Sequence, residues 1–219
     1  MQHFALDAYR GLGDSSLDPQ FNPPDGWSIV AFAGDGDFRD PEGVDDDFGL
    51  FNAPTFQATA YRKGNDIVIS YRGTDDGNAA LGSPAAELLG TSVPLGAGVG
   101  DGIATAAGLL IPGGPPVTFY TDTYIFDAYR FYEKVLSVIG ATPDQVTFTG
   151  HSLGGIVAGV MSAATGRPGM AFAPGPHNKA LELLEPYVTE SGQTVGEIVG
   201  DTQDFSQLQT FRLFGEVLG

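Results

Sequence analysis

The sequence predicts an α/β fold, in which a mostly parallel sheet carries helices on both of its faces. Residues 66–71 are a β-branched run that ends at a glycine-containing loop, which is typical of a buried strand. Residues 145–149 form a similar run, and small and apolar residues over 153–164 follow it as an expected helix. A short strand at 170–173 and a helix at 178–184 continue the pattern. Such alternation of strands and helices indicates a parallel sheet.

An amphipathic helix is expected over residues 121–139, with Thr121 or Asp122 as its N-cap. The polar positions of this helix recur every three or four residues, at Asp127, Arg130, Lys134 and Ser137. Before residue 56 the sequence is rich in Gly, Pro and Asp, which favours turns with short strands such as 28–33 between them. No internal repeat or domain boundary is visible, so residues 1–219 are expected to form one domain, whose last residues end in mid-pattern.

The charge balance and the cysteine count argue against several classes of function. Ten basic residues stand against 27 acidic ones, and the formal net charge of −17 would repel nucleic acids and anionic lipid surfaces. Cysteine is absent, so neither disulfides nor thiolate metal sites can form. The first residues lack the basic and apolar regions of a signal peptide. We therefore expect no nucleic-acid partner and no cleaved signal peptide.

The motif that carries chemistry is Gly150-His151-Ser152-Leu153-Gly154, which matches the pattern G-x-S-x-G. Glycines on both sides of a serine let the backbone turn sharply from a strand into a helix and expose the hydroxyl. The expected strand before the motif and the expected helix after it supply that setting, and they predict Ser152 as a nucleophile. The alternative is a Gly/Ser-rich turn that only caps a helix.

A serine nucleophile also needs donors for the oxyanion that forms when it attacks a carbonyl. The segment Arg72-Gly73-Thr74-Asp75 follows the strand at 66–71 and reaches the same sheet edge as the serine motif. The backbone amide of Thr74 is therefore predicted to pair with that of Leu153 as an oxyanion hole. The alternative is a plain turn at the end of a strand.

Residues 67–74 (IVISYRGT) together with residues 150–155 (GHSLGG) resemble the class 3 lipase family. More narrowly, they are similar to the bacterial lipases that carry calcium-binding repeats beyond their catalytic domain. The resemblance covers about residues 60–175. It implies the α/β-hydrolase fold, here with the C-terminal part of the pattern missing, and ester hydrolysis. It also implies Ser152 as nucleophile, Thr74 and Leu153 at the oxyanion hole, and a mobile lid within residues 78–120.

The family orders its catalytic residues Ser, Asp, His, and this chain departs from that order. Asp201, after an apolar run expected to be a strand, resembles the family's acid, although Asp204 competes with it and a surface aspartate is the alternative. No histidine follows Asp201. His3 lies near the terminus and His151 points away from the serine, so His177 is the candidate base within the chain, with an exposed loop histidine as its alternative. We favour a histidine outside these 219 residues; otherwise the machinery is rearranged.

Carboxylates cluster over residues 34–47 at spacings that suit calcium, and the candidate ligands are Asp35, Asp37, Asp45 and Asp47. A solvated acidic loop is the alternative, because a calcium site also needs a turn that brings its ligands together. The chemistry itself requires no cofactor, so any Ca²⁺ would be structural.

These observations predict an extracellular carboxylic-ester hydrolase that forms an acyl-enzyme on Ser152, with a cytoplasmic location as the alternative. Its expected substrate is an acyl ester or a lipid, with transient contact to a lipid interface. Two other functions stay open. The same nucleophile serves acyltransferases, thioesterases and amidases, and the missing histidine leaves room for a hydrolase-like domain that binds without catalysis.

Overall fold

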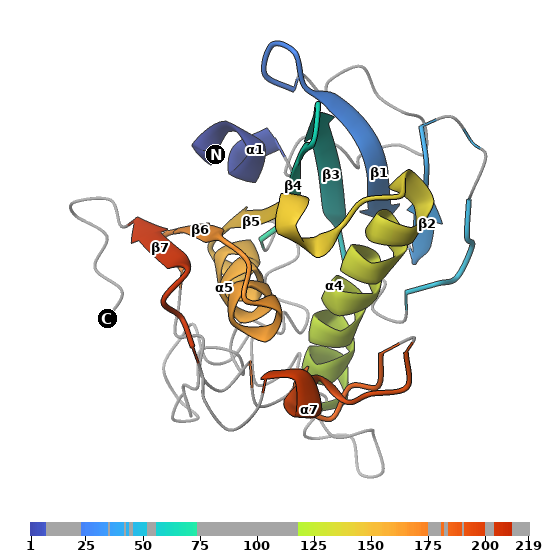
Figure 1. Cartoon of the computed structure of the whole chain (residues 1–219), viewed down its shortest axis with the longest axis vertical. Helices are drawn as coiled ribbons and strands as arrows, with labels where there is room; N and C mark the ends of the chain where they lie inside the picture. Colours follow the sequence, from blue (N-terminus) through green and yellow to red (C-terminus); the bar gives the residue numbers. More distant parts are fainter. Residues whose placement is uncertain are drawn as a thin grey trace, which may run out of the picture.

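A computed structural model describes residues 1–7, 23–34, 36–41, 43, 46–51, 56–73, 118–174, 181, 184–189, 191–199 and 204–211. Its centre is a seven-stranded sheet in the order β2-β1-β3-β4-β5-β6-β7 (Figure 1). The strands are β1 (Ser28–Gly34), β2 (Asp37–Arg39), β3 (Ala58–Lys63), β4 (Asp66–Tyr71), β5 (Val146–His151), β6 (Gly169–Phe172) and β7 (Leu208–Phe211). The expected strands at 28–33, 66–71, 145–149 and 170–173 therefore all appear, within one or two residues of their predicted ends.

The sheet is mixed, and the expectation of a mostly parallel sheet was wrong. β2, β1, β3 and β4 pair antiparallel, whereas β4, β5, β6 and β7 pair parallel. For the pair β3 and β4 the cause is local, because a two-residue turn at Gly64 and Asn65 joins the two strands in the register Lys63 opposite Asp66. Gly64 has φ 61, which such a turn requires, and a connection this short can join antiparallel strands only.

Helices cover both faces of the sheet in the described part of the chain. The long helix α4 (Thr118–Ile139) and the helix α5 (Leu153–Thr165) lie beside each other, and α1 (Gln2–Asp7) lies apart from them (Figure 1). Ile67 and Ile69 of β4 belong to the core under α4 and α5, whereas Val68 between them packs with Phe4 of α1. Alternate residues of a strand point to opposite faces, so α1 covers the face opposite to α4 and α5.

Two shorter elements complete the described fold. The 3₁₀ turn η1 (Pro143–Gln145) precedes β5, and the short helix α7 (Val195–Val199) packs against α5. Thr194 and Glu197 form a reciprocal capping pair at the start of α7, in which each side chain accepts a hydrogen bond from the other's backbone amide. The apolar run that ends at residue 199 was expected to be a strand, and this prediction was wrong, because the capping pair starts a helix there.

Helix α4 departs from its prediction at its start and on its polar side. It begins at Thr118 rather than at residue 121, so Thr121 and Asp122 lie inside the helix, and residues 118–120 of the predicted lid belong to its first turn. Residues 78–117 of the predicted lid lie outside the described part of the chain. Asp127, expected on a solvated polar face, is fully buried.

Part of the polar side of α4 packs against the segment 46–51. The Arg130 guanidinium donates a 2.9 Å hydrogen bond to the carbonyl of Leu50 and lies 3.7 Å from the Asp127 carboxylate. Lys134 lies 3.6 Å from the Asp47 carboxylate, and its ammonium stands 5.5 Å from the centre of the Phe38 ring. Periodicity identified these polar positions correctly. Ion pairs and a cation–π contact hold Asp127, Arg130 and Lys134 against the neighbouring segment, whereas Ser137 is exposed.

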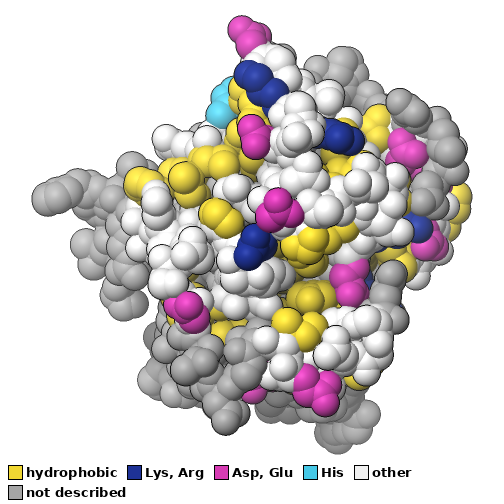
Figure 2. Space-filling model, in the orientation of Figure 1, with side chains coloured by type: hydrophobic (Ala, Val, Ile, Leu, Met, Phe, Trp, Pro, Cys, Tyr) yellow, Lys and Arg dark blue, Asp and Glu magenta, His cyan; other side chains and the backbone are white. Residues whose placement is uncertain are grey.

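Acidic and basic side chains are interspersed on the face of the molecule seen in Figure 2, with hydrophobic side chains between them. In the described residues, the large hydrophobic side chains that are exposed are Phe48, Val188, Ile198 and Phe211. No helix in the described ranges is both long enough and apolar enough to cross a membrane.

An aromatic cluster joins α4 to the sheet and to the segment before α7. The rings of Tyr129 and Tyr132 lie 5.7 Å apart, Tyr129 contacts Tyr187 at 5.4 Å, and Tyr132 contacts Phe148 of β5 at 5.5 Å. Burial raises the pKa of Tyr129 to about 12, and the nearby Glu133 carboxylate adds to this effect. Burial likewise raises the pKa of Tyr132 to about 12.

We expect these two phenols to make the protein less stable in strong alkali. In the unfolded chain a tyrosine ionises near pH 10, whereas both groups stay neutral in the folded protein up to about pH 12. Their contribution to the free energy of unfolding is therefore fully present below pH 10 and is lost as the pH rises from 10 to 12. Urea midpoints at pH 9 and pH 11 measure the loss, which should be smaller in a Tyr129→Phe/Tyr132→Phe variant. An equal loss in both proteins would contradict the assignment.

Candidate active site

Ser152 lies in a tight turn between β5 and α5 and has an unusual backbone conformation. Its φ of 55° and ψ of −121° are rare for a residue with a side chain and cost about 1–3 kcal/mol. The turn is held on both sides, because the Ser152 amide donates to the Phe172 carbonyl at 3.0 Å and the Ser152 carbonyl accepts from the Ile156 amide at 3.1 Å. The strand–turn–helix unit expected from the motif is therefore present.

Ser152 occupies the N-cap position of α5, yet its side chain makes no capping hydrogen bond. A serine that served only as a helix cap would accept a hydrogen bond from an amide of the first turn. The positive φ turns the side chain away from that bond, so the structure does not favour the purely capping alternative.

Two glycines of the motif leave no room for a side chain. A Cβ atom on Gly150 would lie 2.1 Å from the carbonyl oxygen of Gly154. A Cβ atom on Gly154 would lie 2.0 Å from the carbonyl oxygen of Tyr71 and 2.9 Å from the carbonyl carbon of Arg72. Both distances are far below van der Waals contact, so these positions require glycine. The same contacts show that the first turn of α5 lies directly against the end of β4.

The first turn of α5 places an amide that has no partner within the helix next to the serine. Leu153 is the first residue of this 13-residue helix, so its amide has no carbonyl partner within the helix. The positive end of the helix dipole also lies here and favours negative charge. An oxyanion formed at Ser152 would therefore meet a donor and a favourable field.

The end of β4 is fixed by Gln57, the residue before β3. The Arg72 amide donates to the Gln57 carbonyl at 3.1 Å, and the Arg72 guanidinium donates to the Gln57 side-chain oxygen. Thr74, predicted as the second oxyanion donor, lies outside the described residues, so its pairing with Leu153 stays a prediction. The motif that contains Arg72 gave no indication in the sequence of a role for the Arg72 side chain or for Gln57.

The end of β6 forms a second strained turn beside the serine. Ala173 has φ 47, and its amide donates to the Phe211 carbonyl of β7 at 2.7 Å. Phe172, just before it, is the residue whose carbonyl accepts from Ser152. Backbone hydrogen bonds thus connect β7, β6 and the serine turn at one edge of the sheet, and strained residues are common at functional sites.

The described residues do not identify the base that would serve Ser152. His3 is exposed on α1. Gly150 faces α5, so strand alternation places the side chain of His151 on the opposite face of the sheet. His177, the candidate base, lies outside the described residues, as does most of the helix expected at 178–184.

The described residues do not identify the acid either, and the segment before Asp201 is not the expected strand. Asp201 lies outside the described residues, and the run before it is α7 rather than a strand. Asp204 is exposed, and its carboxylate accepts a hydrogen bond from the Ser206 amide, which lowers its pKa. β7 runs parallel to β6, and Asp204 precedes it, so Asp204 lies at the amino ends of the parallel strands. Ser152 lies at their carboxyl ends, and Asp204 is therefore excluded as its partner.

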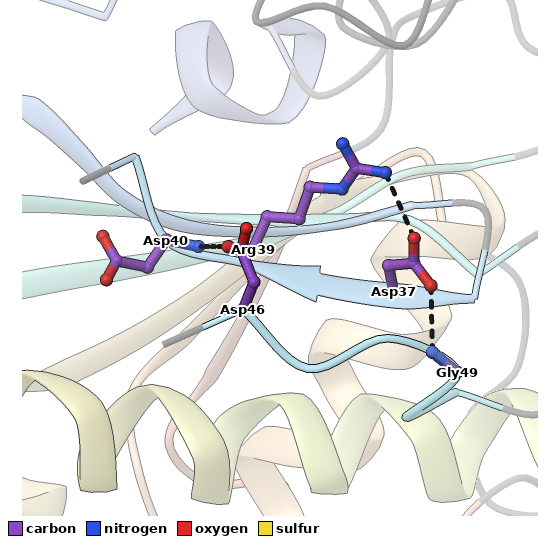
Figure 3. Close-up of polar contacts among 5 residues, drawn as sticks. All are labelled: Asp37, Arg39, Asp40, Asp46 and Gly49. Atoms are coloured by element: carbon purple, nitrogen blue, oxygen red, sulfur yellow. Dashed lines mark hydrogen bonds and ion pairs between the residues drawn. The ribbon is translucent and has the colours of Figure 1, made fainter. Parts of the chain in front are cut away.

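The acidic segment before residue 50 is organised by hydrogen bonds and ion pairs (Figure 3). One oxygen of Asp37 lies 3.1 Å from the Arg39 guanidinium, and the other accepts from the Gly49 amide at 2.9 Å. The Asp46 carboxylate accepts from the Asp40 amide at 3.2 Å.

The carboxylates of this segment that the structure describes do not converge on one point. Asp37 shares the side of β2 that bears Arg39, whereas Asp47 lies opposite Phe38 and faces Lys134 of α4. Asp35 and Asp45, the other candidate calcium ligands, lie outside the described residues. Within the described ranges, no group of three or more His, Asp or Glu side chains could hold a metal ion.

Together the fold and the site define an α/β protein in which a central parallel strand ends in a tight, serine-bearing turn. No protein-family model matches the chain, and no curated protein matches it. Among solved structures, the chain is similar to the crystal structure of the extracellular lipase LipA from Serratia marcescens, with a TM-score of 0.37 and 22% sequence identity. The similarity covers 85% of this chain and 27% of the lipase, so the chain spans about a quarter of that protein's length.

Proposed function

We propose that this chain is a serine hydrolase that cleaves carboxylic esters through an acyl-enzyme on Ser152. The observation that carries the proposal is the backbone of Ser152, which holds a positive φ in a turn where Gly150 and Gly154 have no room for side chains. Such a turn costs free energy, and its geometry presents a hydroxyl that is not used to cap the helix. The expected substrates are acyl esters or lipids.

The reaction would begin with attack of the Ser152 hydroxyl oxygen on the carbonyl carbon of the ester. The hydroxyl proton passes to a histidine base, which then gives it to the departing alcohol as the ester bond breaks. The amide of Leu153 donates to the oxyanion, and the Thr74 amide is the proposed second donor. Water then attacks the acyl-enzyme by the same route, releasing the carboxylic acid and restoring the serine.

A fluorophosphonate probe tests this proposal directly, because it reacts with serines that a base has activated. We expect rapid labelling of the native protein in its complete encoded form, with whichever histidine serves as the base, and we expect peptide mass spectrometry to locate the adduct on Ser152. Protein unfolded in urea before labelling is the control, and it should not react. If Ser152 of the native protein stays unmodified, the proposal is wrong and a hydrolase-like binding domain is favoured.

If labelling succeeds, competition between water and added alcohol or thiol acceptors would separate a hydrolase from an acyltransferase.

A further inference from the structure

We infer that Gln57 and Arg72 form a positioning pair, which holds the end of β4 against the turn that carries Ser152 and the Leu153 amide. This inference rests on the proposed function and deepens it, because it assigns a role to two side chains outside the serine motif.

The pair extends the β3–β4 hairpin by one step. Ala58 lies opposite Tyr71 in the antiparallel register, so Gln57 and Arg72 are the next residues of the two strands. Their backbones continue the ladder through the 3.1 Å bond from the Arg72 amide to the Gln57 carbonyl. The side chains add a second bond, from the Arg72 guanidinium to the Gln57 amide oxygen. Two bonds between the same residues fix both the position and the direction in which the chain leaves β4.

The side chain of Arg72 is buried, which is rare for a charged residue. Arg72 is 9% exposed and Gln57 is partly buried, and Gly73, the next residue, is buried as well. Charged side chains are almost never buried without partners, because removing the charge from water is costly. Arginine suits this role, since its planar fork keeps its charge and fixes the direction of its hydrogen bonds. The buried guanidinium of Arg72 is therefore hydrogen-bonded to the side-chain oxygen of Gln57, the residue just before β3.

The contact with α5 links this pair to the proposed chemistry. A Cβ atom added to Gly154 would lie 2.0 Å from the Tyr71 carbonyl oxygen and 2.9 Å from the Arg72 carbonyl carbon. The backbone at the end of β4 and the first turn of α5 are therefore in direct contact, with no space for a side chain between them. A shift at Arg72 would therefore change the position of that turn, which carries Ser152 and the Leu153 amide. An oxyanion donor contributes fully only when its distance to the developing charge is correct.

The test compares three variants in the full chain with a short p-nitrophenyl ester. Gln57→Leu keeps the approximate size of the side chain and removes the acceptor, whereas Gln57→Glu keeps an acceptor for the guanidinium. The matched control is Gln145→Leu. The Gln145 side chain also accepts a hydrogen bond, from the Thr142 amide at 2.8 Å. Gln145 lies just before β5, at the amino ends of the parallel strands, whereas Arg72 lies at the carboxyl end of β4. The rate constant kcat is expressed per serine titrated by the fluorophosphonate, so that unfolded protein does not count.

We expect Gln57→Leu to lower kcat about 10- to 100-fold with KM changed less than about twofold, because a misplaced oxyanion donor affects the transition state more than substrate binding. Gln57→Glu should stay within about threefold of the parent protein. Gln145→Leu should lower the melting temperature and leave kcat per titrated serine unchanged. An active parent protein with equal kcat in Gln57→Leu would overturn the positioning role alone, as would equal losses in Gln57→Leu and Gln145→Leu. A parent protein without turnover or labelling would overturn the proposed function, and this inference with it.

Discussion

Replacing Ser152 with alanine is expected to lower ester hydrolysis by about 10⁴-fold or more, because a nucleophile that forms a covalent intermediate has no substitute. The fold should survive the change. The Ser152 hydroxyl makes no capping hydrogen bond with α5, and alanine retains the Cβ atom, so the cost of the positive φ stays nearly the same. Loss of activity with an unchanged structure is therefore the expected signature.

Turnover of a short p-nitrophenyl ester and the thermal unfolding midpoint measure the two halves of this prediction. Ser28→Ala is a matched control, because Ser28 starts β1, away from the serine turn, and its hydroxyl donates to the Arg62 carbonyl at 3.4 Å. The control should keep full activity. Turnover in Ser152→Ala close to that of Ser28→Ala would remove the basis for a serine mechanism and would direct attention to other groups.

The parts of the fold that the sequence alone predicted are those specified by neighbouring residues. β4 begins and ends at the predicted residues because its β-branched run is bounded by polar and glycine residues. The strand–turn–helix unit around Ser152 was predicted for the same reason, since the two glycines that permit the turn stand within two residues of the serine. Structure that depends on residues close together in the chain can therefore be predicted from the local sequence pattern.

Two signals were present in the sequence and were not used. Gly64-Asn65 between two polar residues is a two-residue hairpin signal, and it would have predicted β3 and its antiparallel pairing with β4. Thr194 and Glu197 stand at capping-box spacing, and they would have predicted α7 instead of a strand before Asp201. In both cases apolar periodicity over a few residues was ambiguous, whereas the turn and cap residues were not.

The remaining differences arise from contacts between residues far apart in the chain, which periodicity does not encode. The polar stripe of α4 was expected to face solvent, because nothing near it in sequence reveals that Arg130 contacts Leu50 and that Lys134 contacts Asp47. The bond between Gln57 and Arg72 spans 15 residues and depends on the hairpin between them. The turn that carries the proposed nucleophile is therefore predictable from the sequence, whereas the residues that hold the turn in place are less so.

Replacing Gly154 with alanine is expected to damage both stability and activity, although the change adds a single methyl group. The new Cβ atom would lie 2.0 Å from the backbone oxygen of Tyr71, and neither strand β4 nor helix α5 can move aside as a flexible side chain would. Overpacking against backbone costs about 1–3 kcal/mol or more, which exceeds the gain of about 1 kcal/mol that alanine brings to a helix over glycine. The helix end must therefore move away from β4, and a displacement near 1 Å at a catalytic group lowers the rate about 100-fold.

Gly155→Ala makes the same chemical change one residue later and serves as the control. Its Cβ atom would lie 3.2 Å from the Gly150 carbonyl oxygen and 3.2 Å from the Cβ atom of Pro174, so neighbours need to shift only by tenths of an ångström. Because both glycines lie in the first turn of α5, the two variants share any effect of helix propensity and differ mainly in the space available. Urea unfolding and kcat per titrated serine should therefore separate them, with a large loss in Gly154→Ala and a small one in Gly155→Ala. Equal behaviour of the two variants would mean that the close approach of α5 to β4 does not set the geometry of the serine turn.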